Sequence, residues 1–378
     1  MRVLVAFDKF KDALSAEAAC AAAAPAIAAK HPDWSIDLCP LTDGGEGFAV
    51  TLTRALGGSL ETLEVAGPRR GPATAAFGLV SPTALPDDAR AMLKLEPGRH
   101  NCIAIADLAS TSGLALLPLS DRNPWETTTL GAGQLLAELS RRVDGIVLGI
   151  GGSATNDLGC GALSALGVRF LDAFGTPLDP PTPKTWVDLA RLEGRPTVAP
   201  LAIACDVVNP LLGPSGATAI FGPQKGLPAS DVRRLDALAG RVADSMCGHF
   251  GQAVARAGEK GMGAAGGFSF GLAISAGAKL LPGFDFVAAC LGLNRRLAAA
   301  DLVVTGEGRF DATSLAGKAP GTLSARARRL GKTAHIFAGS LGVSADRVHH
   351  PITPEGMPLA AALPRTAELL QAAIAREL

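Results

Sequence analysis

The sequence predicts an α/β protein of two domains, the second of which is inserted into the first. Strand and helix patterns alternate at both ends of the 378-residue chain, which is typical of a parallel sheet covered by helices. From about residue 61 to residue 105 the sequence pattern changes to short apolar runs separated by turn residues, with no predicted helix. We therefore assign residues 1–66 and 286–378 to a discontinuous first domain and residues 67–285 to the inserted domain.

The first domain is predicted to begin with the strand RVLVAF, a short apolar run that contains β-branched residues and is bounded by charges. A helix is expected over residues 15–31, because this alanine-rich stretch has high helix propensity and Ser15 can cap its start. A second strand follows over residues 35–41. A second helix over residues 47–58 ends at a pair of glycines, which are common helix stops.

The inserted domain is predicted to contain short strands first and helices later. The short strands are expected over residues 60–68, 74–80, 90–96 and 101–108. They are followed by a helix over 123–143, a buried strand over 144–150 and a helix-then-strand pair over 161–171. After residue 285 the α/β alternation resumes, with a helix over 284–300, a strand over 301–306, a helix over 322–331 and a strand over 333–339.

The composition favours a small-molecule partner. Lysine plus arginine equals aspartate plus glutamate, 35 of each, so the sequence carries no basic surplus that would indicate nucleic acid. The hydrophobic fraction of 48% makes a large core available. The uncharged run over residues 261–278 consists mostly of Gly, Ala and Ser, with too little Leu, Ile or Phe for a membrane span, so we expect no membrane association through it.

Cysteine and histidine patterns argue against disulfide and zinc sites. The seven cysteines are scattered and never spaced as Cys-x-x-Cys, which favours reduced thiols in a cytoplasmic protein. The six histidines show no metal-ligand spacing, and His349 and His350 lie in a polar segment that we expect to be solvated. The amino-terminal MRVLVAFDKF is predicted to be a strand rather than a signal peptide, because charges follow after four apolar residues.

Two glycine- or charge-rich segments follow strands of the first domain. In LCPLTDGGEGF, Asp43 and Glu46 lie among three glycines, where carboxylates are costly to position unless something binds there. In LVAFDKFKDALS, Asp8, Lys9 and Lys11 come just after the first strand and before a helix, a place that suits a phosphate or a carboxylate. The alternative for the second segment is a solvated run of charges at a helix start.

A third segment, IVLGIGGSATNDLG, has the residue types of a phosphate-binding loop. Its glycines allow close backbone approach, Ser153, Thr155 and Asn156 are neutral donors, and Asp157 could face a metal or a hydroxyl. The segment is neither Gly-x-Gly-x-x-Gly nor a P-loop. A tight strand-to-helix turn with a purely structural role is an equally good interpretation.

Two further segments complete a set of five. Residues 203–226 carry Asp206, Asn209, Gln224 and Lys225 after a strand, and residues 302–321 carry four more charged side chains, namely Glu307, Arg309, Asp311 and Lys318. Five such segments predict a shared polar site of acids and cations, which suits phosphoryl transfer. The sequence lacks a Gly-x-Ser-x-Gly elbow, a cysteine beside a histidine and a dinucleotide fingerprint, so acyl transfer and hydride transfer are disfavoured.

The same segments resemble the signatures of the glycerate kinase family, type I bacterial class. The matching motifs are FDKFKDALSA, PLTDGGEG, RNPWETTTLGAGQLL, GIGGSATND, CDVVNPLLGPSGA with FGPQKG, and VTGEGRFDATSLAGKAP. The resemblance implies ATP-dependent phosphorylation of D-glycerate with Mg²⁺, forming 2-phosphoglycerate, with 3-phosphoglycerate as the alternative product. It also implies a Rossmann-like parallel-sheet domain interrupted by an inserted α/β domain, with the active site in the cleft between them.

Charge needs of glycerate and MgATP suggest roles for these residues. We expect Asp43 to be the general base, with Asp206 as the alternative, and Lys9 and Lys11 to neutralise phosphoryl or carboxylate charge. Candidate ligands of Mg²⁺ are Asp43, Glu46 and Asp206. The residues expected to bind substrate or nucleotide are Asp8, Lys9, Gly44, Gly45, Glu46, Gly151, Gly152, Ser153, Asn156, Asp157, Asn209, Glu307, Asp311 and Lys318.

Three positions depart from the family pattern. Thr313 stands where Gln is usual, and Leu158 and Ser269 stand where Gly is usual, which is expected to shorten one ligand contact and to stiffen two loops. The competing hypotheses are a kinase for another small hydroxy acid and a non-catalytic module that senses glycerate or a nucleotide. A monomer or a homodimer, without nucleic acid or membrane partners, is expected.

Overall fold

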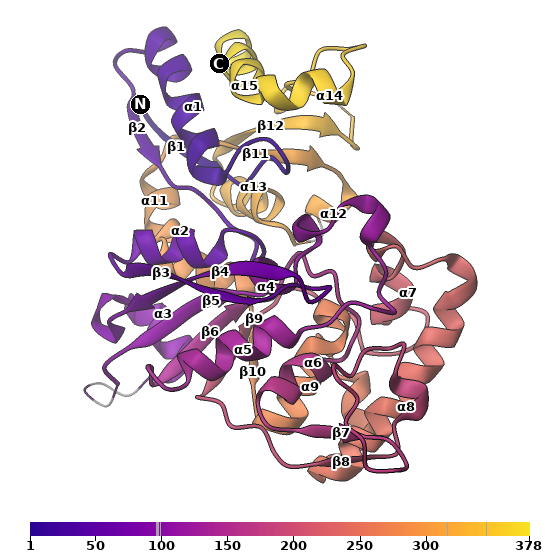
Figure 1. The fold of residues 1–378 in the computed structure, drawn as a ribbon. Helices are drawn as coiled ribbons and strands as arrows, with labels where there is room; N and C mark the ends of the chain where they lie inside the picture. Colours follow the sequence, from indigo (N-terminus) through magenta and orange to yellow (C-terminus); the bar gives the residue numbers. More distant parts are fainter. Residues whose placement is uncertain (96–97, 99, 316, 345) are drawn as a thin grey trace. The chain divides into compact units, whose positions relative to one another are not determined.

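The computed structural model describes residues 1–95, 98, 100–315, 317–344 and 346–378, and these form two compact units. Unit 1 comprises Met1–Asp43 and Phe284–Leu378, and unit 2 comprises Gly44–Gly283 (Figure 1). The predicted α/β fold class is confirmed. The first division lies after Asp43 rather than after residue 66, because the strand β3 (Ser59–Ala66) pairs along its length with β4 (Pro72–Val80) in the sheet of unit 2.

Unit 1 contains a five-stranded sheet in which all strand pairs are parallel. In spatial order its strands are β13 (His349–Pro351), β12 (Thr333–Leu341), β11 (Leu302–Phe310), β1 (Arg2–Phe7) and β2 (Ser35–Leu38). The chain runs from β1 to β2 in one direction and from β11 through β12 to β13 in the other. The switch point of the sheet therefore lies between β1 and β11, where open α/β sheets bind ligands at the carboxyl ends of the strands.

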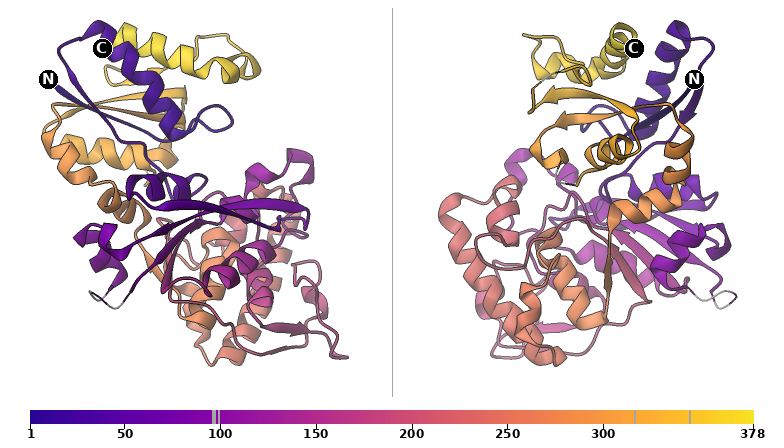
Figure 2. Two further views of the ribbon diagram at one scale, coloured as in Figure 1. Left: turned by 60° about the vertical axis from the view of Figure 1, so that its left-hand side comes forward. Right: turned by 180° about the vertical axis from the view of Figure 1, so that it is seen from behind.

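Helices cover both faces of this sheet (Figures 1 and 2). Its helices are α1 (Ala16–Lys30), α10 (Gly283–Cys290, which crosses the division between the units), α11 (Leu293–Ala299), α12 (Ala312–Leu315), α13 (Ala319–Arg329), α14 (Leu359–Ala362) and α15 (Thr366–Glu377). α1 and α15 pack side by side on the face formed by Val3, Val5 and Phe7, because alternate strand residues point to the same side. The predicted cap of α1 is present: the Ser15 hydroxyl accepts a hydrogen bond from the backbone N–H of Ala18 at 3.1 Å.

Unit 2 contains a six-stranded mixed sheet. In spatial order its strands are β10 (Lys279–Leu281), β9 (Leu201–Ala204), β6 (Gly145–Gly149), β5 (Ile103–Asp107), β4 and β3, while β7 (Arg169–Leu171) and β8 (Arg191–Glu193) form a separate pair. The strands from β10 to β5 are parallel, and β4 is antiparallel to both of its neighbours. The carboxyl ends of β5, β6 and β9 therefore meet at one edge.

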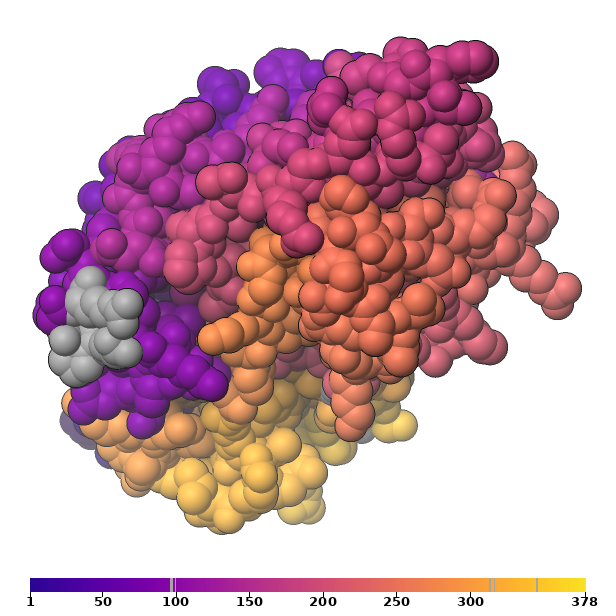
Figure 3. Space-filling view, turned by 90° about the horizontal axis from the view of Figure 1, so that it is seen from below, coloured from indigo at the N-terminus to yellow at the C-terminus, as the bar shows by residue number. Residues whose placement is uncertain are grey.

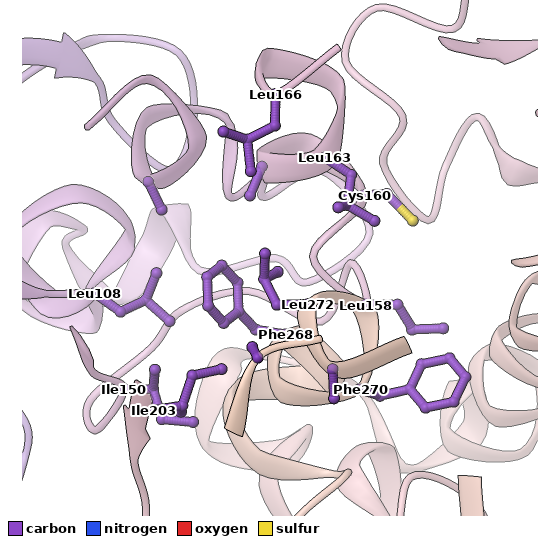
Figure 4. Close-up of a cluster of buried hydrophobic side chains, with 14 of the residues drawn as sticks. Leu108, Ile150, Leu158, Cys160, Leu163, Leu166, Ile203, Phe268, Phe270 and Leu272 are labelled. Carbon is purple, nitrogen blue, oxygen red and sulfur yellow. The ribbon is translucent and has the colours of Figure 1, made fainter. Parts of the chain in front are cut away.

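Helices also cover the sheet of unit 2, with α2 and α5 on opposite faces (Figures 1 and 2). They are α2 (Phe48–Ala55), α3 (Asp87–Leu93), α4 (Ala109–Ser112), α5 (Leu130–Leu139), α6 (Cys160–Ala165), α7 (Ala217–Phe221), α8 (Val232–Phe250) and α9 (Ala264–Ala276). The buried side chains of α9, including Phe268 and Leu272, gather with residues at the strand ends such as Leu108 and Ile203 (Figure 4). Later segments of unit 2, coloured magenta to orange, form much of the surface seen in Figure 3.

Three predicted elements differ from the structure. The strand expected over residues 90–96 is wrong where the structure describes it, because Asp87 and Asp88 favour a helix start and α3 forms there. The helix expected over 123–143 is shorter, since α5 covers only ten of those residues. The helix expected over 284–300 is split into α10 and α11 at Gly292, which has a φ of 59°.

The solvated state expected for the histidine pair is wrong for His350. Its side chain is buried, its Nε2 lies 2.9 Å from Nδ1 of His335, and its Nδ1 lies 3.4 Å from a carboxylate oxygen of Glu377. Pairing of β13 with β12 brings His350 next to His335. Within the described residues, no helix is long and apolar enough to cross a membrane.

The three family departures have different outcomes. The side chain of Thr313 lies outside the described part of the structure. Leu158 is buried and has a φ of 53°, in the left-handed region that strains any residue with a Cβ. Ser269 is buried in α9, and its hydroxyl donates to the carbonyl oxygen of Gly261 at 2.6 Å.

Candidate functional site

The predicted site residues fall into two groups, one in each unit. The first group, the unit 1 cluster, consists of Asp8, Lys9, Asp43, Glu307 and Lys318. Asp8 and Lys9 follow β1, and Glu307 lies in the carboxyl half of β11, on the two sides of the switch point. A hydrogen bond of 3.0 Å from the backbone N–H of Asp8 to the carbonyl oxygen of Gly306 holds this turn beside β11.

Two ion pairs connect the unit 1 cluster. Lys9 Nζ lies 3.2 Å from Asp43 Oδ1, and Lys318 Nζ lies 3.2 Å from Glu307 Oε2. Glu307 Oε1 is buried and has no hydrogen-bond partner among the described residues. The cluster therefore holds two lysine cations and three carboxyl groups, one oxygen of which has no donor among the residues that the structure describes.

Asp8 has a strongly perturbed carboxyl group. Its side chain is 3% exposed, and its Oδ1 accepts the backbone N–H of Lys9 at 2.7 Å. Burial raises the pKa of Asp8 from 3.8 to about 7, and the nearby Asp43 carboxylate adds to that rise, while the Lys9 charge opposes it. Burial also raises the pKa of Glu307, against the effect of Lys318. A carboxylate with a pKa near 7 is matched to general-base work at neutral pH.

Lys11 and Asp311, which the sequence assigned to the same site, also lie in unit 1, and a Cβ on Gly308, the residue after Glu307, would lie 3.1 Å from the backbone N of Lys11. Lys11 is exposed in the turn after β1. Asp311 Oδ2 lies 3.1 Å from Nε of Arg309, and its backbone N–H donates to the Ser314 hydroxyl, which fixes the turn that leads into α12.

The second group, the unit 2 loop cluster, consists of Ser153, Thr155, Asn156, Asp157 and Lys225. The first four follow β6, and Lys225 follows α7. Lys225 is 2% exposed, and its Nζ donates to Ser153 Oγ at 3.1 Å and to the carbonyl oxygen of Thr155 at 2.6 Å. Burial lowers the pKa of Lys225 to about 7, although the charge of Asp157 opposes that change.

Glycines bring the loop after β6 against the segment that contains Gly44 and Gly45. The N–H of Gly151 donates to the carbonyl oxygen of Gly44 at 3.0 Å. A Cβ on Gly149 would lie 2.4 Å from that same oxygen, and a Cβ on Gly151 would lie 2.9 Å from the backbone of Gly45. Glycine is therefore required at both positions because two backbones touch there.

Asp157 has a structural role rather than the metal- or hydroxyl-facing role that we expected. Its carboxylate accepts hydrogen bonds from N and Oγ1 of Thr129, at 2.7 and 2.8 Å, and from the N–H groups of Gly159 and Gly161, at 3.1 and 3.2 Å. These four donors tie the loop to α5 and α6. By contrast, Thr155 Oγ1 and Asn156 Oδ1 are buried without a hydrogen-bond partner in the described part of the chain.

The remaining predicted residues of unit 2 are more open. Glu46 is exposed in the turn before α2, and Asp206 is exposed just after β9. Asn209 is half-buried, and its Nδ2 donates to the carbonyl oxygen of Ser215 at 2.7 Å. These positions put Glu46 and Asp206 where a ligand can reach them and give Asn209 a part in shaping its own loop.

Sequence reasoning missed two buried charged residues of unit 2 as site residues. Asp107 ends β5 and accepts the N–H groups of Ala49 and Ser110, at 3.3 and 2.9 Å, and burial raises its pKa. An aspartate straight after an apolar strand was the available signal. Lys225 was noticed in the sequence, but nothing there distinguishes a buried lysine from an exposed one.

The described acidic, histidine and cysteine side chains form no group of three or more that could hold a metal ion. Mg²⁺ bound with a nucleotide commonly uses one or two carboxylates plus phosphate oxygens, so single exposed acids such as Glu46 and Asp206 have suitable chemistry.

Comparison with known proteins gives consistent matches along the chain. Residues 3–377 match the family model described as the glycerate kinase family. Glycerate kinase from Halalkalibacterium halodurans is 36% identical over 90% of this chain and 86% of that protein. Glycerate 2-kinase from Escherichia coli K12 is 32% identical over 92% of this chain and 88% of that protein. A crystal structure from Salmonella typhimurium LT2, named as a glycerate kinase 2, superposes on this chain with a TM-score of 0.75. The two sequences are 33% identical, and the superposition covers 100% of this chain and 96% of that chain.

Proposed function

We propose that this chain, which belongs to the glycerate kinase family, transfers the γ-phosphoryl group of ATP to the 2-hydroxyl of D-glycerate, releasing ADP and 2-phosphoglycerate. The observation that carries the chemistry is the unit 1 cluster, where a buried carboxyl group with a pKa of about 7 lies at the switch point together with two lysines. Phosphoryl transfer needs a group that accepts the hydroxyl proton and cations that stabilise the phosphoryl oxygens.

Within this cluster, Asp8 is a better candidate for the base than Asp43, which the sequence favoured. One oxygen of Asp43 is engaged by the Lys9 ammonium at 3.2 Å. Asp8 is desolvated, so taking up a proton relieves the cost of burying its charge. Lys9 and Lys318 would neutralise charge on the transferred phosphoryl group.

Mg²⁺ and a cytoplasmic location are part of the proposal. When bound with ATP, Mg²⁺ would neutralise charge on the phosphate oxygens, and Asp43, Glu46 and Asp206 remain the candidate ligands. The seven free cysteines fit a reducing compartment, where a kinase also finds ATP.

The test is a product assay with purified protein, D-glycerate, MgATP and enolase. ADP and phosphoenolpyruvate should appear together, because enolase converts 2-phosphoglycerate directly and phosphoglycerate mutase is left out. ADP without phosphoenolpyruvate would make 3-phosphoglycerate the product. If no small hydroxy acid stimulates ADP release, the kinase assignment fails and the binding-module hypothesis takes its place. Comparing kcat/KM for other hydroxy acids checks the substrate.

A further inference from the structure

Lys225 is a buried cation whose hydrogen-bond acceptors are both neutral. Its ammonium donates to the hydroxyl oxygen of Ser153 and to the carbonyl oxygen of Thr155. Burying a charge is costly unless an opposite charge compensates it at close range. The arrangement is therefore stabilised further by any anion that binds near this lysine.

The charge of Lys225 can act at the surface of the loop through Ser153. Because Ser153 Oγ accepts a hydrogen bond from the ammonium, its own O–H remains available to donate. Ser153 follows Gly152, which is exposed and has a φ of 73°, so the hydroxyl lies next to an accessible backbone. A hydroxyl that is polarised by a cation is a stronger donor to an oxyanion than an isolated one.

Neighbouring groups also point to a ligand. Thr155 Oγ1 and Asn156 Oδ1, on fully buried side chains, have no partner in the described residues. Asn156 Oδ1 is an acceptor, so a ligand that carries hydroxyl groups as well as an anion would satisfy it.

Two charged residues lie near Lys225 in the described part of unit 2. The charged groups around Lys225 are Asp157, whose oxygens accept four donors, and Arg122, whose backbone lies against Gly226. Arg122 Nη2 donates to the neutral carbonyl oxygen of Leu114.

We infer that Lys225 is the cation of an oxyanion subsite on unit 2, and that it acts through the hydroxyl of Ser153 on a ligand bound at the loop that contains Gly151 and Gly152. The inference rests on the proposed function, which supplies two oxyanions: the carboxylate of the hydroxy acid and the phosphates of the nucleotide. Both ligands carry hydroxyl groups, but the 2-hydroxyl of the hydroxy acid is on the carbon next to its carboxylate, whereas the ribose hydroxyls of the nucleotide lie farther from its phosphates. A compact ligand held at Ser153 that also donates to the unpartnered Asn156 oxygen is therefore the hydroxy acid. Lys225 is thus a positioning residue for the substrate, separate from the base in unit 1.

The experiment measures binding directly by calorimetry, with D-glycerate and ADP as separate probes. The variants are Lys225→Met, Ser153→Ala and the double variant, with Lys260→Met, an exposed lysine of the same unit, as the control. Each single variant should weaken D-glycerate binding about tenfold or more, the range of a hydrogen bond to a charged group. The double variant should bind D-glycerate only slightly more weakly than either single variant, because Lys225 acts on the ligand through Ser153 and the two losses are therefore not additive. Lys260→Met should bind as the wild type does.

A pH profile separates the electrostatic role from a structural one. The carboxylate of D-glycerate stays ionised from pH 6 to pH 9, whereas the pKa of Lys225 is about 7. Wild-type affinity should therefore fall as the pH rises above 7, and the affinity of Lys225→Met should not change over that range. Ser153→Ala keeps the lysine in place, so it tests the subsite even if Lys225→Met fails to fold.

The outcomes are distinct from those of the product assay. Loss of ADP binding with unchanged D-glycerate binding would overturn the hydroxy-acid assignment and give the subsite to the nucleotide. Binding of both probes within twofold of the wild type in Ser153→Ala would overturn the subsite itself. A lack of kinase activity together with the predicted loss of D-glycerate binding would reject the proposed function and leave the subsite standing.

Discussion

Replacing Asp8 by Asn should stabilise unit 1 at neutral pH while abolishing most of the activity. Asp8 is nearly fully buried, and Asn has the same shape and can still accept the N–H of Lys9 through its carbonyl oxygen. The substitution therefore removes the charge with little change in packing. It also removes the proton acceptor that the proposed mechanism needs.

The size of the effect follows from the pKa shift. Between pH 3.8 and about pH 7, the two pKa values of Asp8 in the unfolded and folded states, the folded protein binds more protons at Asp8 than the unfolded chain does. The free energy of unfolding therefore falls as the pH rises through this window. A shift of this size corresponds to about 4 kcal/mol at most, at about 1.4 kcal/mol per pKa unit. About 3 kcal/mol of that lies between pH 5 and pH 8. Asp8→Asn has no such penalty.

Urea unfolding at pH 5 and pH 8 measures this difference. The wild type should lose stability relative to Asp8→Asn by a few kcal/mol on going from pH 5 to pH 8, and the comparison cancels the titration of groups that both proteins share. Asp12→Asn is the matched control, because Asp12 is exposed and its φ of 61° suits Asn as well as Asp. It should not change the pH dependence.

Equal pH dependence of the wild type and Asp8→Asn would refute the reasoning, because Asp8 would then ionise in the folded protein as it does in water. Such a carboxylate would be too weak a base for proton transfer at neutral pH. The same variant should lower kcat about 10²-fold or more, the usual contribution of a general base.

Three further predictions test other features of the two units. Asp43→Asn should shift the acidic limb of the pH–rate profile to lower pH, because it removes a carboxylate that raises the pKa of Asp8. A loss of kcat of about 10²-fold at every pH would instead identify Asp43 as the base. Gly149→Ala should destabilise the protein by about 1–3 kcal/mol in urea unfolding, since its Cβ would lie 2.4 Å from the carbonyl oxygen of Gly44. The control is Gly248→Ala in α8, whose Cβ would meet nothing within 4 Å and which should stabilise the protein slightly. Leu158→Gly should be more stable than Leu158→Ala by about 1 kcal/mol, which is the reverse of the usual order. Both variants lose the buried side chain, but only Gly relieves the strain of a φ of 53°. Equal thermal midpoints of the two variants would show that the backbone at this residue is not strained.

The sequence predicted the elements whose pattern is local. The strand that became β1, the capped helix α1 and the buried strand β6 all follow from apolar runs, propensity and capping, which depend on neighbours in the chain. The structure divides the units after Asp43, because the pairing of β3 with β4 is decided by tertiary contacts that no local pattern reveals. The segment from residue 44 to residue 66 could have continued the first domain on its pattern alone.

The site was predicted by residue type but not by partner. Long-range contacts decide which charges are buried: Lys225 meets Ser153 and Thr155 across separations of 72 and 70 residues. The four donors of Asp157 come partly from Thr129, in a segment that the sequence assigned to a continuous helix. Residue types therefore indicated a phosphate-handling protein, whereas the roles of individual acids required the fold.

Asp157 and Asp8 show why a raised pKa alone does not identify a functional acid. Burial raises the pKa of both, yet the oxygens of Asp157 accept four internal donors, whereas Asp8 accepts one, the N–H of Lys9, within the described part of the chain. The same change should therefore have opposite signs at the two positions. Asp157→Asn would turn an amide NH₂ toward groups that themselves donate, and it should destabilise unit 2 by about 2–4 kcal/mol in urea unfolding at pH 8. If Asp157→Asn is as stable as the wild type, the internal donors do not distinguish a structural aspartate from a catalytic one, and the case for Asp8 then depends on its kcat alone.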